Sequence, residues 1–233
     1  MKKSLLVLAV LSAFAPVLAQ AEAGDIVVRL RAAYVNPDEK SKLGSLDGGL
    51  TTADGRLAVG NNTIPELDIS YYFTKNIAAE LILAAGTRHD VSIVGQAVGA
   101  GTLPNQPLGS VNILPPTLTA QWHFNPDQMI DPYVGAGGAF VLGLDRKLNG
   151  HVTALNADLP IRIDRSAFGA VLQAGFDVNL QDKWLVNFDV KKIWFNTDVK
   201  IDATPAQTLD GYQKIDNLRI NPLVVSVGIG KKF

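Results

Sequence analysis

The sequence predicts an all-β protein: an eight-stranded antiparallel transmembrane β-barrel with short periplasmic turns and four long extracellular loops. Two patterns predict it, an alternation of apolar and polar side chains with a period of two and a regular exchange of short and long connections. Composition agrees, because 47% of the 233 residues are hydrophobic. Beyond the N-terminal segment, no stretch approaches the roughly eighteen apolar residues of a transmembrane helix, and lipid tolerates only helices and closed barrels.

Each predicted strand has one apolar face and one mixed face. In the first strand, Val28 and Leu30 alternate with Arg29 and Arg31, as expected of residues that point in turn to lipid and to lumen. We expect the eight strands at about residues 25–35, 63–73, 77–86, 117–124, 132–142, 167–180, 184–197 and 223–233.

One residue of the seventh strand conflicts with this alternation. Strict alternation turns Lys192 toward lipid, where a charged side chain costs roughly 2–4 kcal/mol at mid-membrane and less near an interface. Two local solutions are open. Either the strand has a bulge at Lys191–Lys192, or the side chain snorkels toward the outer interface.

The connections between strands separate the two rims of the barrel. Short links follow the second, fourth and sixth strands, at residues 74–76, 125–131 and 181–183. The other four links have about twenty residues or more and are rich in Gly, Asn, Asp, Thr and Pro. Short turns at one rim and long loops at the other are the outer-membrane pattern, in which the long loops lie outside the cell.

Aromatic residues fall near the strand ends, where the two membrane interfaces are expected. Near the short-turn rim we place Phe73, Trp122, Phe124, Tyr133, Trp184 and Phe233. Near the long-loop rim we place Tyr34, Phe140, Phe168 and Trp194. Two such belts agree with the orientation that the connections give.

The N-terminal segment predicts export. Lys2 and Lys3 precede an apolar run over residues 4–18, and small residues suited to cleavage follow. We expect a signal peptide over residues 1–21, cleaved after Ala21 or Ala23, and a single barrel domain over residues 22–233. The chain has no cysteine, so no disulfide staples it. With 21 basic and 22 acidic residues, it has no nucleic-acid character.

The predicted lumen mixes paired charges with apolar residues. Arg29 and Arg31 share a face with Glu66 and Asp68 of the next strand, within cross-strand reach, so we expect lumen ion pairs among them. Apolar candidates for a substrate path are Ile82, Val171, Leu185, Ile193 and Val224. Such an interior conducts ions poorly but could admit small, weakly polar molecules.

Prolines suggest where the wall is weak. Pro65, Pro115, Pro116 and Pro222 all fall near the outer ends of strands, and a proline inside a closed sheet removes a ladder hydrogen bond. In one interpretation they only begin those strands. In the other they form a lateral opening, through which a ligand leaves sideways into lipid.

Catalytic chemistry has little support in the sequence, and we expect no enzyme, no cofactor and no metal. His89, His123 and His151 are widely scattered, and no Gly-x-Ser-x-Gly elbow occurs. The sequence His89-Asp90 suits a surface hydrogen bond better than a catalytic pair. The glycines of residues 135–138 lack the spacing of a dinucleotide loop and lie inside a strand.

These motifs together resemble the OmpW family of small outer-membrane barrels, related to the AlkL hydrocarbon importers. The segments that carry the resemblance are residues 29–37 (RLRAAYVNP), 72–81 (YFTKNIAAEL), 89–90 (HD), 114–118 (LPPTL), 132–137 (PYVGAG) and 173–177 (QAGFD). The resemblance implies a monomer with a narrow hydrophobic lumen that passes small hydrophobic molecules across the bacterial outer membrane. The last strand ends on Phe233, which resembles the ending that the barrel-assembly machinery reads. Residues 147–165 and 202–215 match no family pattern.

The first expected function is therefore passive uptake of small hydrophobic solutes, with or without lateral release into the membrane. The expected partners are those solutes, outer-membrane lipids and lipopolysaccharide, and the assembly machinery. Two alternatives stay open. One is a non-transporting structural or receptor barrel that acts through its loops. The other is a lipid-modifying enzyme, which needs a Ser/His pair facing lipid near the outer leaflet, whereas His123 lies near the opposite rim.

Overall fold

The computed structural model describes residues 22–41, 43, 55–95, 105–152, 156–202 and 211–233. The predicted signal peptide, residues 1–21, lies outside these described residues. Among the described residues, no helix is long and apolar enough to cross a membrane.

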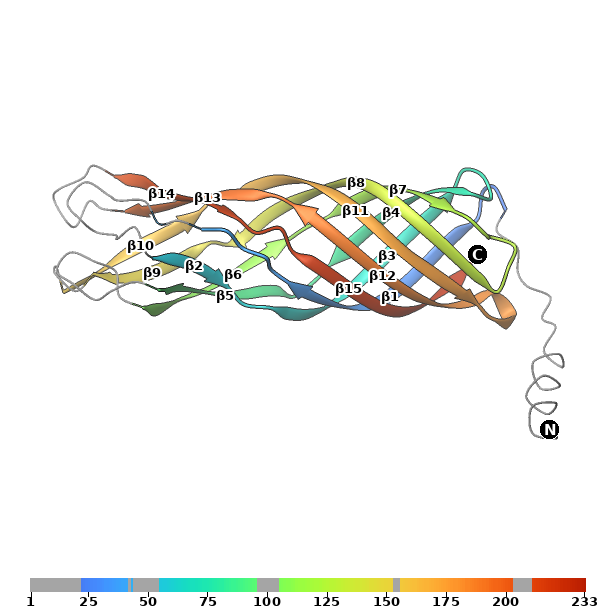
Figure 1. Ribbon diagram of the computed structural model, residues 1–233, viewed down its shortest axis with the longest axis horizontal. Coiled ribbons are helices and arrows are strands. Elements are labelled where there is room, and N and C mark those ends of the chain that lie inside the picture. Colours follow the sequence, from blue (N-terminus) through green and yellow to red (C-terminus); the bar gives the residue numbers. More distant parts are fainter. Residues whose placement is uncertain (1–21, 42, 44–54, 96–104, 153–155, 203–210) are drawn as a thin grey trace, which may run out of the picture.

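In the described part of the chain, eight antiparallel strands close into a barrel (Figure 1). The strands are β1 (Ile26–Asn36), β3 (Asn62–Tyr72), β4 (Ile77–Ala84), β7 (Thr117–His123), β8 (Ile130–Asp145), β11 (Ser166–Asn179), β12 (Trp184–Trp194) and β15 (Leu223–Lys232). Each pairs with its neighbour in order, β15 pairs with β1, and the β8–β11 ladder completes the circle. The predicted barrel, its strand positions and its short turns are confirmed.

The long connections contain strands that continue the barrel beyond its membrane-spanning part (Figure 1). They are β2 (Arg56–Val59), β5 (Thr87–Val94), β6 (Gln106–Leu114), β9 (Lys147–Val152), β10 (Ala157–Ile163), β13 (Asn196–Asp202) and β14 (Tyr212–Arg219). The long extracellular connections therefore contain strands that the prediction did not include. Alternate residues of these strands, such as Ile93, Leu148, Ile161 and Ile201, are buried together and form a core of their own.

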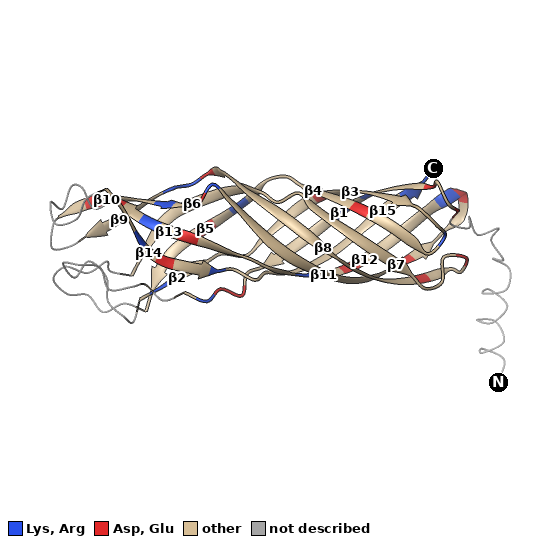
Figure 2. Cartoon of the chain, turned by 90° about the horizontal axis from the view of Figure 1, so that it is seen from above, with Lys and Arg blue, Asp and Glu red and all other residues tan. Residues whose placement is uncertain are grey.

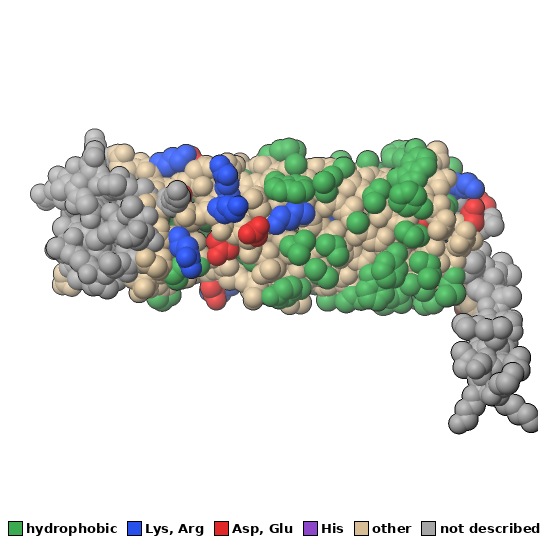
Figure 3. Space-filling model, viewed as in Figure 1, with side chains coloured by type: hydrophobic (Ala, Val, Ile, Leu, Met, Phe, Trp, Pro, Cys, Tyr) green, Lys and Arg blue, Asp and Glu red, His purple; other side chains and the backbone are tan. Residues whose placement is uncertain are grey.

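Apolar side chains cover the outside of the barrel strands. Figure 3 shows them gathered on the visible face of the barrel, with charged side chains concentrated nearer the extracellular extension. The predicted belt residues exposed at the short-turn rim are Phe73, Trp122, Phe124, Trp184 and Phe233, and those at the other rim are Tyr34, Phe140, Phe168 and Trp194. The placement of Tyr133 was wrong. It is 1% exposed and faces the lumen, because β8 turns Asp131, Tyr133 and Gly135 inward.

Lys192 snorkels, and β12 has no bulge. The strand keeps an unbroken register with both β11 and β15. The Lys192 ammonium donates to the Asn221 carbonyl at 2.7 Å and to the Asp38 carboxylate at 3.2 Å. Asn221 lies just before β15 begins, and Asp38 lies just after β1 ends. The charge therefore reaches the outer rim and avoids the hydrocarbon.

Glycines allow neighbouring strands to approach closely in this narrow barrel. Gly137 of β8 lies opposite Thr119 of β7. A Cβ added at Gly137 would overlap with the backbone carbonyl of Leu118 and would lie 2.7 Å from the Thr119 Cα. Since both are backbone atoms, no side-chain rearrangement can make room.

We therefore expect Gly137→Val to destabilise the barrel by about 1–3 kcal/mol or more, the usual effect of overpacking. The measurement is urea unfolding in lipid vesicles, followed by tryptophan fluorescence. Ala136→Val is the matched control, because Ala136 is exposed on the outer face of the same strand. Equal midpoints for the two variants would contradict the close-approach interpretation.

Candidate functional site: an apolar chamber above a charged plug

The lumen of the membrane-spanning barrel is filled by a charged plug. Among the described residues, three cations and five carboxylates form it, each at most 4% exposed: Arg29, Arg31, Lys191, Glu66, Asp68, Glu80, Asp177 and Asp189. Figure 2 shows that charged residues lie on the barrel strands as well as in the extracellular extension. Buried charges at this density need partners, because an unpaired one is costly.

Arg29 joins the plug across the lumen. Its guanidinium donates to both oxygens of Asp177, at 2.6 and 3.3 Å, and to the Ser70 hydroxyl at 2.7 Å. It also lies 3.4 Å from Glu80. The contact with Asp177 is bidentate, which is the strongest and most directional form of such a pair.

Arg31 and Lys191 complete the network. Arg31 lies 2.9 Å from Glu80 and 3.2 Å from Asp68. The Lys191 ammonium contacts Asp189 at 2.8 Å and Glu66 at 3.1 Å. The amide of Gln173 donates to Glu80 and to Asp189, both at 2.7 Å, and so connects the two halves.

The expected ion pairs between neighbouring strands form only in part. Arg31 and Asp68 are paired, but Glu66 pairs with Lys191, and Arg29 pairs with Asp177 and Glu80. The register does place Arg29 opposite Asp68 and Arg31 opposite Glu66. Long side chains instead reach across the narrow lumen to distant strands, a contact that strand order alone does not reveal.

The periplasmic end of the lumen holds a second polar group and a small apolar cluster. The His123 Nδ1 lies 2.7 Å from Asp131, and its Nε2 lies 3.1 Å from the Tyr72 hydroxyl. Val27, Tyr72, Ala78 and Leu185 pack together there. His123 thus faces the lumen and is 0% exposed, so it cannot act on lipid.

A metal ion does not suit this end of the lumen. Ligand atoms of His123, Asp131 and Asp177 lie within 4.8 Å of one another. The Asp177 oxygens, however, already accept from Arg29 and Asn187, and Asp131 accepts from His123 and the Asn125 amide. A cation bound here would face the Arg29 guanidinium, which repels it.

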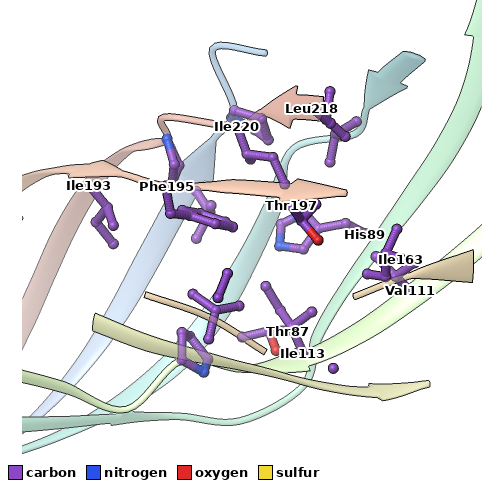
Figure 4. Close-up of a pocket in the computed structure, with 18 of the residues that line it drawn as sticks. Thr87, His89, Val111, Ile113, Ile163, Ile193, Phe195, Thr197, Leu218 and Ile220 are labelled. Carbon is purple, nitrogen blue, oxygen red and sulfur yellow. The ribbon is translucent and has the colours of Figure 1, made fainter. Parts of the chain in front are cut away.

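Above the plug the lumen becomes apolar. A chamber lies between the plug and the extracellular core, and Figure 4 shows part of its lining. The volume that the centre of a water molecule can occupy in it is about 100 Å³. Its walls include Val35, Ile64, Ala84, Ile113, Val141 and Phe195, and Glu66 and Lys191 form its floor. An apolar cavity of this kind binds apolar molecules in preference to water.

The predicted path residues are all buried, but they do not form one path. Ile82, Ile193 and Val224 line the chamber, and Val171 is buried in the same apolar cluster. Leu185 lies in the separate cluster at the periplasmic end. The plug therefore separates Leu185 from the chamber.

The wall of the chamber has a break in its ladder beside two of the predicted prolines. The β4–β7 ladder ends at Ile82–Thr117, and the β5–β6 ladder begins at Thr87–Ile113. Between these described pairs, no backbone hydrogen bond joins residues 83–86 to residues 114–116. Pro115 has no N–H to donate toward these residues, which explains part of the break. The Pro116 carbonyl accepts from the Phe140 amide, so residue 116 faces β8 instead.

The other two prolines lie in different surroundings. Pro65 is exposed on β3, and its carbonyl accepts from the Ala85 amide. Because the N–H and C=O of a strand residue point to the same neighbour, the missing N–H of Pro65 weakens this link. Pro222 lines the chamber, and its carbonyl accepts from Ile193, so the ladder continues there.

Sequence reasoning missed the polar residues of the chamber. Thr87 and His89 point inward from β5, and Thr197 points inward from β13 (Figure 4). His89 and Asp90 do not pair, since His89 is 5% exposed and Asp90 lies on the outer face. The alternation of side chains along residues 87–94 could have predicted these inward positions, but the segment was interpreted as a loop.

Comparison with known proteins agrees with this architecture. The OmpW family model matches residues 22–233. Outer membrane protein W of Vibrio cholerae is 35% identical, over the full length of both chains. AlkL of Ectopseudomonas oleovorans is 27% identical, over 82% of this chain and 76% of AlkL. The crystal structure of OprG from Pseudomonas aeruginosa superposes with a TM-score of 0.77 at 24% identity, covering 93% of this chain and 99% of OprG.

A closed barrel with an apolar outer face, short turns at one rim and a long extension at the other defines an integral protein of the bacterial outer membrane. The chain belongs to the OmpW family. This membership places it among non-enzymatic outer-membrane proteins.

The paired charges of the plug should contribute to the stability of the folded barrel. We expect Arg29→Met alone to cost about 3–5 kcal/mol, because it leaves Asp177 as an uncompensated buried charge. Adding Asp177→Leu should recover a large part of that loss, because both partners are then apolar. Urea unfolding of the two single variants and the double variant gives the coupling energy. Additive losses would show that the pair is not coupled.

Proposed function

We propose that this protein is a passive channel through which small hydrophobic molecules enter the outer membrane. The solute enters through the extracellular extension, occupies the apolar chamber and leaves sideways into the bilayer. The observation that carries the proposal is the apolar chamber directly above a charged plug. The polar lipopolysaccharide layer is a barrier to apolar solutes, and a protein conduit past it gives them access to the hydrocarbon.

The plug argues against a straight path to the periplasm. An apolar solute would have to break contacts such as Arg29–Asp177 and Lys191–Glu66, and it offers no polar group in exchange. Breaking a buried pair costs several kcal/mol. In an eight-stranded barrel the interior is only wide enough for side chains, so the plug cannot move aside without leaving the lumen.

The interrupted ladder supports lateral release. Residues 83–86 have no backbone bonds to residues 114–116, and Pro65 offers them no N–H on the other side. Ala84, which is buried, and Pro115 also line the chamber. This part of the wall therefore needs fewer broken hydrogen bonds to open than a strand pair with a continuous ladder.

Polarity of the chamber should control uptake. We expect Val224→Asn to slow entry of a hydrophobic fluorophore, N-phenyl-1-naphthylamine, about tenfold, because an amide that loses its water costs about 1–3 kcal/mol. The measurement is the rate of fluorescence increase in cells with intact lipopolysaccharide, with and without the protein. Folding of each variant is checked by its heat-dependent electrophoretic shift.

Leu185→Asn is the matched control. It puts the same side chain below the plug, outside the proposed path, and should leave the rate unchanged. If the unmodified protein gives no faster uptake than cells without it, the channel proposal fails, and a receptor role through the extracellular extension becomes the better explanation. Equal slowing by both variants would instead favour a continuous axial path.

Replacing Pro115 and Pro116, which lie at the interruption, should change uptake more than replacing Pro222, where the ladder is continuous. The double variant Pro115→Val with Pro116→Val supplies one backbone donor that faces the broken ladder, from residue 115, and one that faces Phe140 of β8, from residue 116. We therefore expect slower uptake in the same fluorescence assay. Pro222→Val should have little effect, because the Ile193–Pro222 hydrogen bond already continues the ladder there. Unchanged uptake in the double variant would argue against release at this position.

A further inference from the structure

Two polar side chains of the chamber lie next to each other on one strand. Thr87 and His89 belong to β5 and both face inward, while the intervening Arg88 is exposed. Figure 4 shows them pointing into the chamber, among apolar neighbours such as Val111 and Ile113. Two residues on one face of a strand have Cα atoms about 6–7 Å apart, so their side chains can contact the same ligand group.

Thr87 has a hydroxyl without a partner. The residue is 1% exposed, and within the described part of the chain its Oγ1 makes no hydrogen bond. Thr117 offers a contrast in the same chamber, because its hydroxyl donates to the Pro115 carbonyl at 3.1 Å. A buried polar group without a partner is rare and destabilising, so Thr87 is better explained by a partner that comes with the ligand.

His89 offers an acceptor. Its Nδ1 lies 2.8 Å from the Gly60 carbonyl oxygen, and a carbonyl can only accept, so Nδ1 carries the proton in this hydrogen bond. In the neutral ring Nε2 is then a lone-pair acceptor. Together the two side chains present a hydroxyl that can donate and a nitrogen that accepts. A ligand hydroxyl, which is both donor and acceptor, satisfies both at once.

The charges of the plug disfavour an acidic ligand. The floor of the chamber belongs to the plug, in which, among the described residues, five carboxylates face three cations. A carboxylate ligand would add negative charge above this excess and would meet the Nε2 lone pair. An ammonium ligand would have to leave water for apolar walls, which is costly. A neutral hydroxyl avoids both penalties.

We propose that Thr87 and His89 form a binding subsite for the hydroxyl of a neutral aliphatic alcohol, whose hydrocarbon tail occupies the chamber. This inference rests on the proposed function, because it assumes that the chamber holds a hydrophobic solute. It narrows the class of preferred solute from any hydrophobic molecule to one with a single terminal hydroxyl.

The test compares three probes of equal chain length: octan-1-ol, octane and octanoate. Each competes with N-phenyl-1-naphthylamine for the full-length protein in lipid nanodiscs, with empty nanodiscs as the baseline. For the unmodified protein we expect octan-1-ol to bind most tightly. Thr87→Val keeps the shape but removes the hydroxyl, and it should weaken octan-1-ol about tenfold, which corresponds to about 1.4 kcal/mol, while octane is unaffected.

Two further variants make the result specific. Thr87→Ser retains a hydroxyl and should retain the preference for octan-1-ol. Thr117→Val removes a hydroxyl that is already satisfied within the protein, so it should not change the preference. Thr87→Val should also raise the urea midpoint slightly, because it removes an unpaired buried hydroxyl.

The outcomes separate this subsite from the channel proposal. If octane and octan-1-ol both displace the fluorophore with similar affinity, and Thr87→Val changes neither, the subsite is wrong and the chamber stands. If Thr87→Val weakens both probes equally, its effect is on shape and the subsite is again wrong. If no probe displaces the fluorophore from the unmodified protein, the chamber does not bind such solutes, and both proposals fall.

Discussion

The structure depends on how an eight-stranded barrel fills its own lumen. Eight strands enclose a space that side chains must occupy, and this chain fills its centre with Arg29, Arg31, Lys191 and five carboxylates that pair across it. Such a network is stable only when its members are satisfied together. It therefore acts as a fixed floor, and everything above it is separated from the periplasmic end.

The position of that floor is encoded as a change of polarity along single strands. On β1 the inward residues change from Arg29 and Arg31 to Ala33 and Val35 toward the extracellular side, and on β12 they change from Lys191 to Ile193. In both strands the change falls where the plug meets the apolar chamber. The strands of the extracellular extension continue the apolar side of this boundary as the walls and roof of the chamber.

Sequence reasoning recovered the features that depend on alternation and failed where contacts are made at a distance. Strand positions, belts and the inward direction of Arg29 or Ile193 follow from a period of two. The Arg29–Asp177 pair joins residues 148 positions apart, and no local pattern identifies it. The strands of the extension were not predicted, because their glycine, asparagine and proline residues were given more weight than a short alternation. Tyr133 was misplaced because the many glycines of its strand make the inward and outward faces hard to distinguish in the sequence.

The subsite and the interrupted wall have a physical connection. Thr87 is the first residue of β5 to pair with β6 beyond the break, and Pro115 lies at the opposite side of it. A solute held by its hydroxyl at Thr87 and His89 would lie with its hydrocarbon tail beside the part of the wall where residues 83–86 lack ladder bonds to residues 114–116. The apolar end can then enter lipid first, where its burial is favourable. The hydroxyl follows when it exchanges its hydrogen bonds with Thr87 and His89 for hydrogen bonds at the outer interface.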